Sequence, residues 1–248
     1  TYEYTGTLLT SSTDALDGTT TYTYTPQGFL ASVTDPLGRT TSYAYDSLGQ
    51  RTSMTDALGH TTTYTYDDLG RLVATTDPLG HVTRSEFDAA GRLVRSIRNY
   101  DPGRGQNDEN QYNIVTEYGY DEVGNQVSVT DTYGHTTHSE YDAEGRLVRS
   151  TDAQGHETTN AYAAAGRLVS TTDALGRTTT YAYDNAGRLT ATSDPLGGVT
   201  RSTYNLDGTL ASTTDALGRT TTYAYDKLKR VTAVTDALGG VTRTTYDA

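Results

Sequence analysis

The chain has 248 residues, and 19 Lys and Arg against 31 Asp and Glu give it a formal net charge of −12 at pH 7. This acidity argues against nucleic acid as a partner, because phosphate backbones are bound through Lys and Arg. No segment approaches the roughly 20 apolar residues that span a membrane, and the absence of cysteine excludes disulfides and thiolate zinc sites. Since the chain opens on Thr1 without a methionine, we expect it to be a processed product or a piece of a longer protein.

The composition favours an ordered β protein with little core. Hydrophobic residues make up 34% of the chain, whereas Thr occurs 50 times and Tyr 21 times, with two Phe and no Trp. Thr and Tyr are strand formers that suit a half-buried pleated surface. Disordered chains are poor in such residues, so we do not expect disorder.

An internal repeat of 21 residues organises the whole chain. One marker is an Asp that returns at this spacing from Asp14 to Asp77 and again from Asp131 to Asp236. The second marker is an aromatic residue with the same spacing, except for 33 residues across one insertion. The marker aromatics are Tyr24, Tyr45, Tyr66, Phe87, Tyr120, Tyr141, Tyr162, Tyr183, Tyr204, Tyr225 and Tyr246. The sequence therefore predicts about eleven copies of one unit, in a single array over 1–248.

Each copy predicts two strands and two tight turns. Around Asp173 and Asp184, strand-forming runs at 167–172 and 177–183 alternate with two Asp-x-x-Gly segments. Asp at the first position and Gly at the fourth are typical of a type I turn whose Gly takes positive φ in a G1 bulge. The predicted turn residues include Asp35, Gly38, Asp46, Gly49, Asp56, Gly59, Asp67, Gly70, Asp173, Gly176, Asp184 and Gly187.

Strand alternation puts Thr179, Tyr181 and Tyr183 on one face. We predict that the marker aromatics pack beside an aliphatic residue of the neighbouring strand, with the tyrosine hydroxyls in water. Eleven copies give about 22 strands, more than the ~10 at which open twisted sheets curl, split or flatten. The predicted fold is all-β: an antiparallel β-hairpin strip that curls into a spiral shell or hollow, barrel-like wall.

Several copies depart from the pattern. In the first, Asp17-Gly18 displaces the turn Gly by one position. Later turns lose their Asp to Thr25, Ala163 or Asn205, and Lys229 takes the place of a Gly, which predicts a left-handed lysine.

The insertion at about 99–113 is the one unique segment. Its Gly, Pro and polar residues predict a solvated loop. Oxygen ligands for Ca²⁺ are present, but their spacing matches no known calcium loop. These are Asp101, Asn107, Asp108, Glu109 and Asn110.

The repeat accounts for the candidate catalytic and metal-binding residues. Four histidines follow a turn Gly, where other copies have Arg or Gly, so we expect exposed turn residues: His60, His81, His135 and His156. His138 falls on a predicted strand without an evident partner. Asp173 and Asp184 lie at opposite ends of one strand, tens of ångströms apart at ~3.3 Å per residue, which is too far for an acid–base pair. We therefore predict no enzyme activity, no catalytic residue, no cofactor and no metal site.

The unit Tyr-Asp-x-x-Gly-Arg-Leu, as at 66–72 and 183–189, followed by Thr-Asp-x-x-Gly and a Tyr pair, resembles the YD repeat of the Rhs family. That family includes bacterial Rhs polymorphic toxins, cocoon-forming subunits of insecticidal toxin complexes, wall-associated proteins and animal teneurins. The resemblance covers essentially the whole chain. It implies a strip that spirals into a hollow shell and, in bacteria, encloses a C-terminal toxin until delivery.

We therefore expect a structural encapsulating scaffold: a shell segment of a large secreted or cell-surface protein of the Rhs toxin type. The expected partners are further repeats and C-terminal cargo of the same longer chain and, beyond them, a delivery machine or a cell-surface partner, without nucleic acid or a membrane span. The alternative is an extracellular adhesion or ligand-binding surface, as the teneurin and cell-wall relatives allow. Binding of the isolated array to glycans or cell walls would favour this second hypothesis.

Overall fold

The computed structural model describes residues 1–105 and 111–247, and these contain 23 strands and no helix. Contacts divide the chain into unit 1, residues 1–120 and 128–136, and unit 2, residues 121–127 and the chain from 137 onward. No helix long and apolar enough to cross a bilayer occurs in the described residues.

The strands follow one another at short intervals along the chain. The first eleven are β1 (Tyr2–Thr5), β2 (Leu8–Thr13), β3 (Thr19–Tyr24), β4 (Leu30–Thr34), β5 (Thr40–Tyr45), β6 (Arg51–Thr55), β7 (Thr61–Tyr66), β8 (Leu72–Thr76), β9 (Val82–Phe87), β10 (Leu93–Arg98) and β11 (Ile114–Tyr120). The others are β12 (Gln126–Thr130), β13 (Thr136–Tyr141), β14 (Leu147–Thr151), β15 (Glu157–Tyr162), β16 (Leu168–Thr172), β17 (Thr178–Tyr183), β18 (Leu189–Ser193), β19 (Val199–Tyr204), β20 (Leu210–Thr214), β21 (Thr220–Tyr225), β22 (Val231–Thr235) and β23 (Val241–Arg243).

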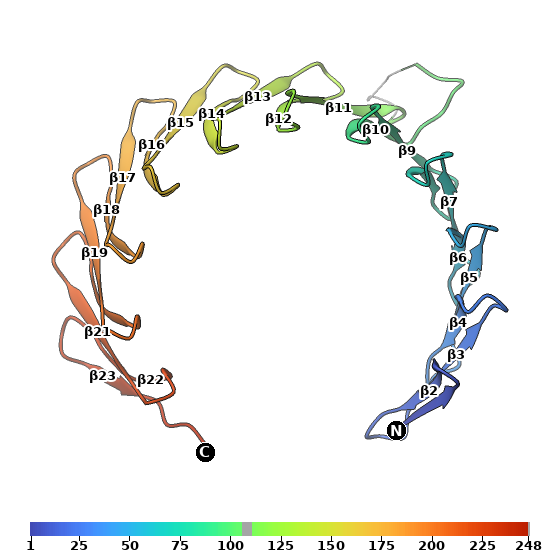
Figure 1. Ribbon diagram of the computed structural model, residues 1–248, viewed down its shortest axis with the longest axis horizontal. Coiled ribbons are helices and arrows are strands. Elements are labelled where there is room, and N and C mark those ends of the chain that lie inside the picture. The colour runs from blue at the N-terminus through green and yellow to red at the C-terminus, as the bar shows by residue number, and fades with distance from the viewer. Residues whose placement is uncertain (106–110, 248) are drawn as a thin grey trace. The chain divides into compact units, whose positions relative to one another are not determined.

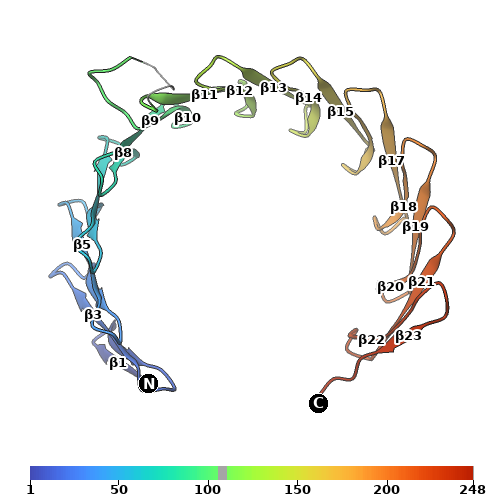
Figure 2. The same cartoon turned by 180° about the vertical axis from the view of Figure 1, so that it is seen from behind.

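Within each unit the strands form a single antiparallel layer (Figures 1 and 2). In unit 1 each strand from β1 to β11 pairs with the next, as β3 pairs with β4 and β4 with β5. In unit 2 the same order runs from β13 to β23. The predicted all-β antiparallel hairpin strip is confirmed. Its curling over the whole array stays a prediction.

The turns lie along two opposite edges of the strip, because successive hairpins fold back in alternation. We call those that follow a marker aromatic the tyrosine-side turns, and those that follow the other strand of each repeat, which ends in Thr or Ser, the threonine-side turns. Asp184–Arg188 is a tyrosine-side turn, and Asp173–Arg177 is a threonine-side turn. The two sets carry different side chains, as described below.

Every predicted turn Gly has the backbone that the pattern requires. In the turn at Asp184, the amide of Gly187 donates to the Asp184 carbonyl at 2.9 Å, and the Asp184 amide donates to the Arg188 carbonyl at 3.0 Å. The φ angles of the six predicted glycines lie between 75° and 85°. These bonds and angles are those of a type I turn closed by a G1 bulge. Lys229 has φ 62°, so the predicted left-handed lysine is confirmed.

A β-bulge repeats next to the marker aromatics. Between β17 and β18 the register shifts between Ala182 and Tyr183, so that Tyr183 faces Leu189. A bulge sets two residues of one strand against one of the other. The prediction that the aromatic packs beside an aliphatic residue of the neighbouring strand is therefore confirmed. The residue-by-residue pairing of the two strands, however, is interrupted at Thr190, which has no register partner on β17.

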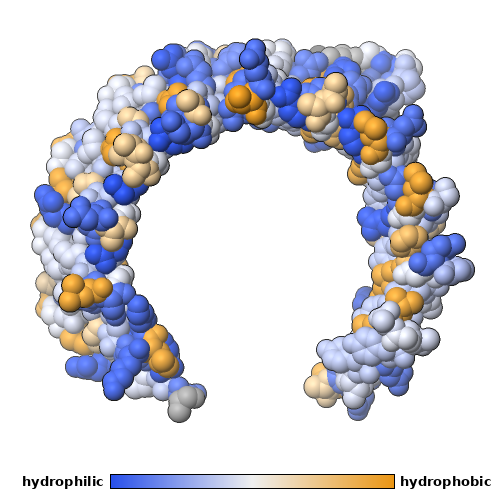
Figure 3. All heavy atoms as spheres, in the orientation of Figure 1, coloured by the Kyte–Doolittle hydropathy of each residue, from blue (hydrophilic) through white to orange (hydrophobic). Residues whose placement is uncertain are grey.

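Apolar burial is thin. Among the described residues only two hydrophobic side chains are buried, Ile97 and Val115, each 3% exposed and facing one another across β10 and β11. Figure 3 shows the apolar residues of the visible face as separate spots among polar ones. Stability therefore rests on main-chain ladders and on contacts between neighbouring repeats, as in other one-dimensional arrays.

Hydrogen bonds hold the described base of the insertion, whose residues 102–105 are exposed. Buried Asn113 donates to the carbonyls of Asp101, Arg104 and Gly105 at 3.0, 2.8 and 3.2 Å, and its Oδ1 accepts from the Asp101 amide at 2.9 Å. The side-chain amide of Asn113 thus satisfies main-chain groups of the insertion that a regular hairpin turn would pair with one another. Four candidate calcium ligands lie outside the described residues: Asn107, Asp108, Glu109 and Asn110.

Candidate functional site

The tyrosine-side turns carry the most regular polar site of the molecule, and Asp184 illustrates its first half. Oδ1 of Asp184 accepts the amides of Ala186 at 2.9 Å and Arg188 at 3.0 Å, and its Oδ2 accepts the Arg188 Nε at 2.7 Å. The amide and then the guanidinium of Arg188 hold the pKa of this carboxyl below its ordinary value of 3.8. The carboxylate therefore fixes both the turn and the direction of the arginine.

The second half reaches the next repeat. The Arg188 guanidinium lies 4.6 Å from the centre of the Tyr204 ring, and its Nη1 donates to the Asn205 carbonyl at 3.2 Å. The Tyr204 hydroxyl returns to the first repeat and donates to the Leu189 carbonyl at 2.9 Å. We call this arrangement the Asp–Arg–Tyr clasp. It joins two repeats through side chains, in addition to the strand ladder.

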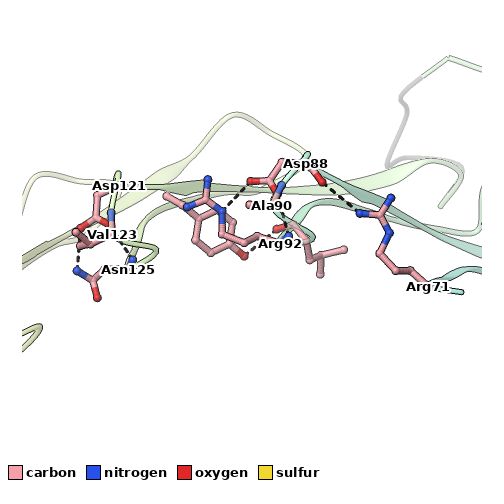
Figure 4. Close-up of polar contacts among 9 residues, drawn as sticks. Arg71, Asp88, Ala90, Arg92, Asp121, Val123 and Asn125 are labelled. Carbon is pink, nitrogen blue, oxygen red and sulfur yellow. Dashed lines mark hydrogen bonds and ion pairs between the residues drawn. The ribbon is translucent and has the colours of Figure 1, made fainter. Parts of the chain in front are cut away.

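The clasp recurs in both units. In unit 1, Arg92 donates to Asp88 and stacks on Tyr120 at 4.8 Å, although the insertion lies between them. Figure 4 shows this carboxylate with Arg92, and also Arg71 of the preceding repeat donating to the Asp88 carbonyl at 3.2 Å. In unit 2 the same contacts join Arg146 to Tyr162 at 4.8 Å and Arg230 to Tyr246 at 4.5 Å.

Two altered copies keep the stacking. Phe29 occupies the arginine position and stacks on Tyr45, with ring centres 5.1 Å apart. Arg167 lacks the turn carboxylate, because residue 163 is alanine, and lies farther from its ring, 5.6 Å from the centre of Tyr183. In these two copies the contact between successive repeats is thus kept without the turn Asp.

The prediction that the tyrosine hydroxyls lie in water is incomplete, because seven of the ten marker tyrosines also have a main-chain acceptor. Seven marker tyrosines donate to the main-chain carbonyl at the start of a strand in the preceding repeat: Tyr24, Tyr45, Tyr66, Tyr120, Tyr162, Tyr204 and Tyr246. The acceptor lies at the start of the directly adjacent preceding strand, as Leu189 on β18 does for Tyr204 on β19, so the hydroxyl adds a side-chain bond to that strand pair. Ten of the eleven marker aromatics are the last residue of a strand, and Tyr246 follows β23.

In several threonine-side turns the carboxylate also pairs with a cation of its own turn, but among the described residues that cation is not stacked on an aromatic of the next repeat. Asp35 and Asp173 pair with Arg39 and Arg177 inside their own turns, at 2.6 and 2.7 Å. In four other turns a histidine takes that place, with Nδ1 to Oδ2 distances of 2.8 to 3.0 Å and side chains more than half exposed: His60, His81, His135 and His156. These histidines are exposed turn residues, as predicted.

The remaining sequence candidates do not converge. His138 lies exposed on β13. Across residues 1–105 and 111–247, no three side chains of the metal-binding types gather at one point. Asp173 and Asp184 are each hydrogen-bonded within their own turn. The arginine of the clasp was not predicted, although in several copies Gly-Arg-Leu is followed by an aromatic residue 16 positions after the arginine.

A single antiparallel layer with repeat-to-repeat clasps defines a β-hairpin repeat scaffold. The model of the RHS repeat family matches residues 2–40, 26–61, 45–82, 66–101, 120–157, 162–199 and 204–241. The chain therefore belongs to the RHS repeat family, whose repeats are structural. A search of curated proteins gives no match.

Solved structures agree on the fold. The crystal structure of TcdB2-TccC3-TEV has a TM-score of 0.68 at 18% identity over 92% of this chain. A Photorhabdus luminescens Tc holotoxin pore, with a TccC3 mutation, has a TM-score of 0.56 at 17% identity over 88%. The crystal structure of TcdB2-TccC3 also has a TM-score of 0.56, at 17% identity over 92%. The chain spans only 13 to 15% of the length of these proteins.

Proposed function

We propose that this chain is a wall segment of an encapsulating shell in a large exported protein of the Rhs toxin type, and that it encloses a cargo located C-terminally in the same longer chain. The function is steric, and the chain is not an enzyme. Its partners are further repeats and that cargo, with a delivery machine or a cell-surface receptor acting on the assembled shell.

The observation that carries the proposal is the clasp on a layer with almost no core. A wall needs continuity between neighbouring units more than it needs a hydrophobic nucleus. Main-chain ladders leave no open edge between strands within a unit, and each clasp adds contacts across three strands. The resemblance in fold to structures of Tc toxin proteins supports the same function.

Protection of the cargo from proteolysis tests the proposal. The longer native chain is digested with a non-specific protease under native conditions, and the segment that follows the repeats is followed by mass spectrometry. We expect it to survive far longer than the same segment produced alone. Digestion at equal rates would contradict enclosure.

Matched variants link protection to the wall. R188A/R230A removes two clasp arginines and should speed digestion of the cargo, because these side chains join successive repeats. R177A/R219A removes two threonine-side arginines, which pair with Asp173 and Asp215 inside their own turns. This control should leave protection unchanged. Equal loss in both variants would point to general destabilisation instead.

A further inference from the structure

The threonine-side turns carry a row of exposed leucines. In unit 1 the third residue of four successive turns is a leucine that is 76 to 91% exposed: Leu16, Leu37, Leu58 and Leu79. In unit 2 four more successive turns have leucines that are 75 to 98% exposed: Leu175, Leu196, Leu217 and Leu238. We call each set of four a leucine row.

Turn formation does not explain these leucines. Turn positions favour Gly, Asn, Asp, Ser and Pro, which supply unusual φ angles or local hydrogen bonds, whereas leucine supplies neither. On the tyrosine side the same backbone has leucine at the third position in only three turns, at Leu48, Leu69 and Leu228, and other turns have residues such as Ala90, Glu144 and Ala186. Among the described turns, unbroken rows of four leucines therefore occur on the threonine side alone, and an exposed apolar row of this kind marks a contact surface.

We propose that a leucine row docks on the leucine row of a second copy of this chain, in antiparallel orientation. Leucines of successive turns lie two strands apart, roughly 9.6 Å at ~4.8 Å per strand. A second row shifted by half that spacing sets its leucines ~4.8 Å from their neighbours, close to the 4.0–4.5 Å of apolar contact. The same edge on both partners gives a closed, two-fold symmetric contact.

The size of a leucine row agrees with this occupant, and its charges predict how the contact depends on salt. Four turns of five residues give 20 residues in each row, and a standard interface uses about 20–30 residues a side. Asp35, Asp173 and Asp215 are paired with arginines in their own turns, at 2.6 to 2.7 Å, which offsets charge at these places. Asp194 and Asp236 are followed by Gly198 and Gly240 at the arginine position, so like charges oppose the contact there, and salt should strengthen it.

Unit 1 offers a closely matched pair of variants. Leu37 and Leu58 on the threonine side are 76% and 81% exposed, and Leu69 and Leu48 on the tyrosine side are 76% and 81% exposed. Asparagine is a favourable turn residue, so L37N/L58N and L48N/L69N both keep the turns. The two variants lose the same number of exposed leucines from opposite edges.

Sedimentation of the 248-residue chain over a range of concentrations tests the proposal. We expect a monomer–dimer equilibrium whose dissociation constant falls with added salt. L37N/L58N should raise this dissociation constant by at least about tenfold, and L48N/L69N should leave it unchanged. Circular dichroism and the urea midpoint should confirm that both variants stay folded. A monomer at every concentration, or equal weakening by both variants, would overturn the proposal.

The chain has no cysteine, so introduced thiols report the contact directly. L37C/L58C sets one thiol opposite its own copy for either half-spacing shift of the rows, and should form an intermolecular disulfide several times faster than L48C/L69C, the matched pair on the opposite edge. Equal rates would also overturn the proposal. The result is independent of cargo enclosure, because no cargo is present in either measurement.

Discussion

At the scale of single residues, the turn aspartate decides how firmly the clasp arginine is held. The Asp184 carboxylate accepts hydrogen bonds from two main-chain amides and one guanidinium, whereas the Ala163 side chain has no atom that can accept them. The backbone bonds of the turn at Ala163 are nevertheless formed, with the Gly166 amide 2.8 Å from the Ala163 carbonyl. The chain therefore contains a natural test of what the carboxylate adds.

We predict that Ala163→Asp stabilises unit 2. The new carboxylate would accept the amides of residues 165 and 167 and pair with Arg167, whose guanidinium already stacks on Tyr183. The expected rise in the thermal midpoint is roughly 1–3 °C for a chain of this size. Ala164→Asp places the same charge one position further on and should give no rise. Equal shifts in the two variants would contradict this role of the carboxylate.

The marker tyrosines give a second residue-scale prediction. Tyr162→Phe removes the hydroxyl that donates to the Leu147 carbonyl at 2.9 Å, and should cost about 0.5–1.5 kcal/mol of unfolding free energy. Phe87→Tyr should do the reverse, because the Leu72 carbonyl lies at the same sequence offset of 15 residues. Urea unfolding of both variants checks this prediction. Changes of the same sign would show that the hydroxyl bond is not the cause.

At the scale of the element, the repeat consists of two strands and two turns, and wherever a described turn opens on Asp, its carboxylate accepts hydrogen bonds in the folded state. The 21-residue spacing, the Asp-x-x-Gly turns and the alternation were enough to predict the strands and the positive φ at glycine. The β-bulge could not be predicted, because Leu189 and Thr190 both suit a strand and nothing in their chemistry says which one is unpaired. The hydroxyl bond of Tyr204 to the Leu189 carbonyl could not be predicted either, because the repeat places the ring beside an aliphatic residue without fixing which polar group its hydroxyl reaches.

The turns also make stability depend on pH. The pKa of Asp88 is lowered by the amide and then the guanidinium of Arg92, and the pKa of Asp142 is lowered by the guanidinium and then the amide of Arg146. A carboxyl whose pKa is lower in the folded than in the unfolded chain stabilises the fold above the unfolded value, 3.8 here, and loses this effect as pH falls through the folded value. We predict that the urea midpoint is steady at pH 5 and falls progressively between pH 4 and pH 2.

The control for pH uses salt. The hydrogen bonds that main-chain amides donate to the carboxylates are short-range and persist in salt. The exposed ion pairs between these carboxylates and arginine are screened by salt. The fall below pH 4 should therefore persist in 1 M NaCl with a smaller amplitude. A midpoint that rises on acidification would contradict the assignment of the turn carboxylates as hydrogen-bonded anions.

At the scale of the whole molecule, stability is a sum of local terms and has no shared nucleus. The two buried hydrophobic residues of the described chain, Ile97 and Val115, lie together beside the insertion. Every other repeat is held by its neighbours. A destabilising substitution in one repeat should consequently promote local unfolding of that repeat and leave distant repeats folded.

Lysine positions make this testable. The only lysines of the chain, Lys227 and Lys229, lie in one tyrosine-side turn, so native digestion with a lysine-specific protease reports the opening of that turn alone. We predict that Asp226→Ala speeds cleavage at least about fivefold, since the carboxylate holds Arg230 at 2.7 Å. Asp67→Ala removes an equivalent contact to Arg71 seven repeats earlier and should leave the cleavage rate unchanged. If both variants accelerate cleavage equally, the array unfolds as one cooperative body, and a wall assembled from nearest-neighbour contacts is the wrong description of it.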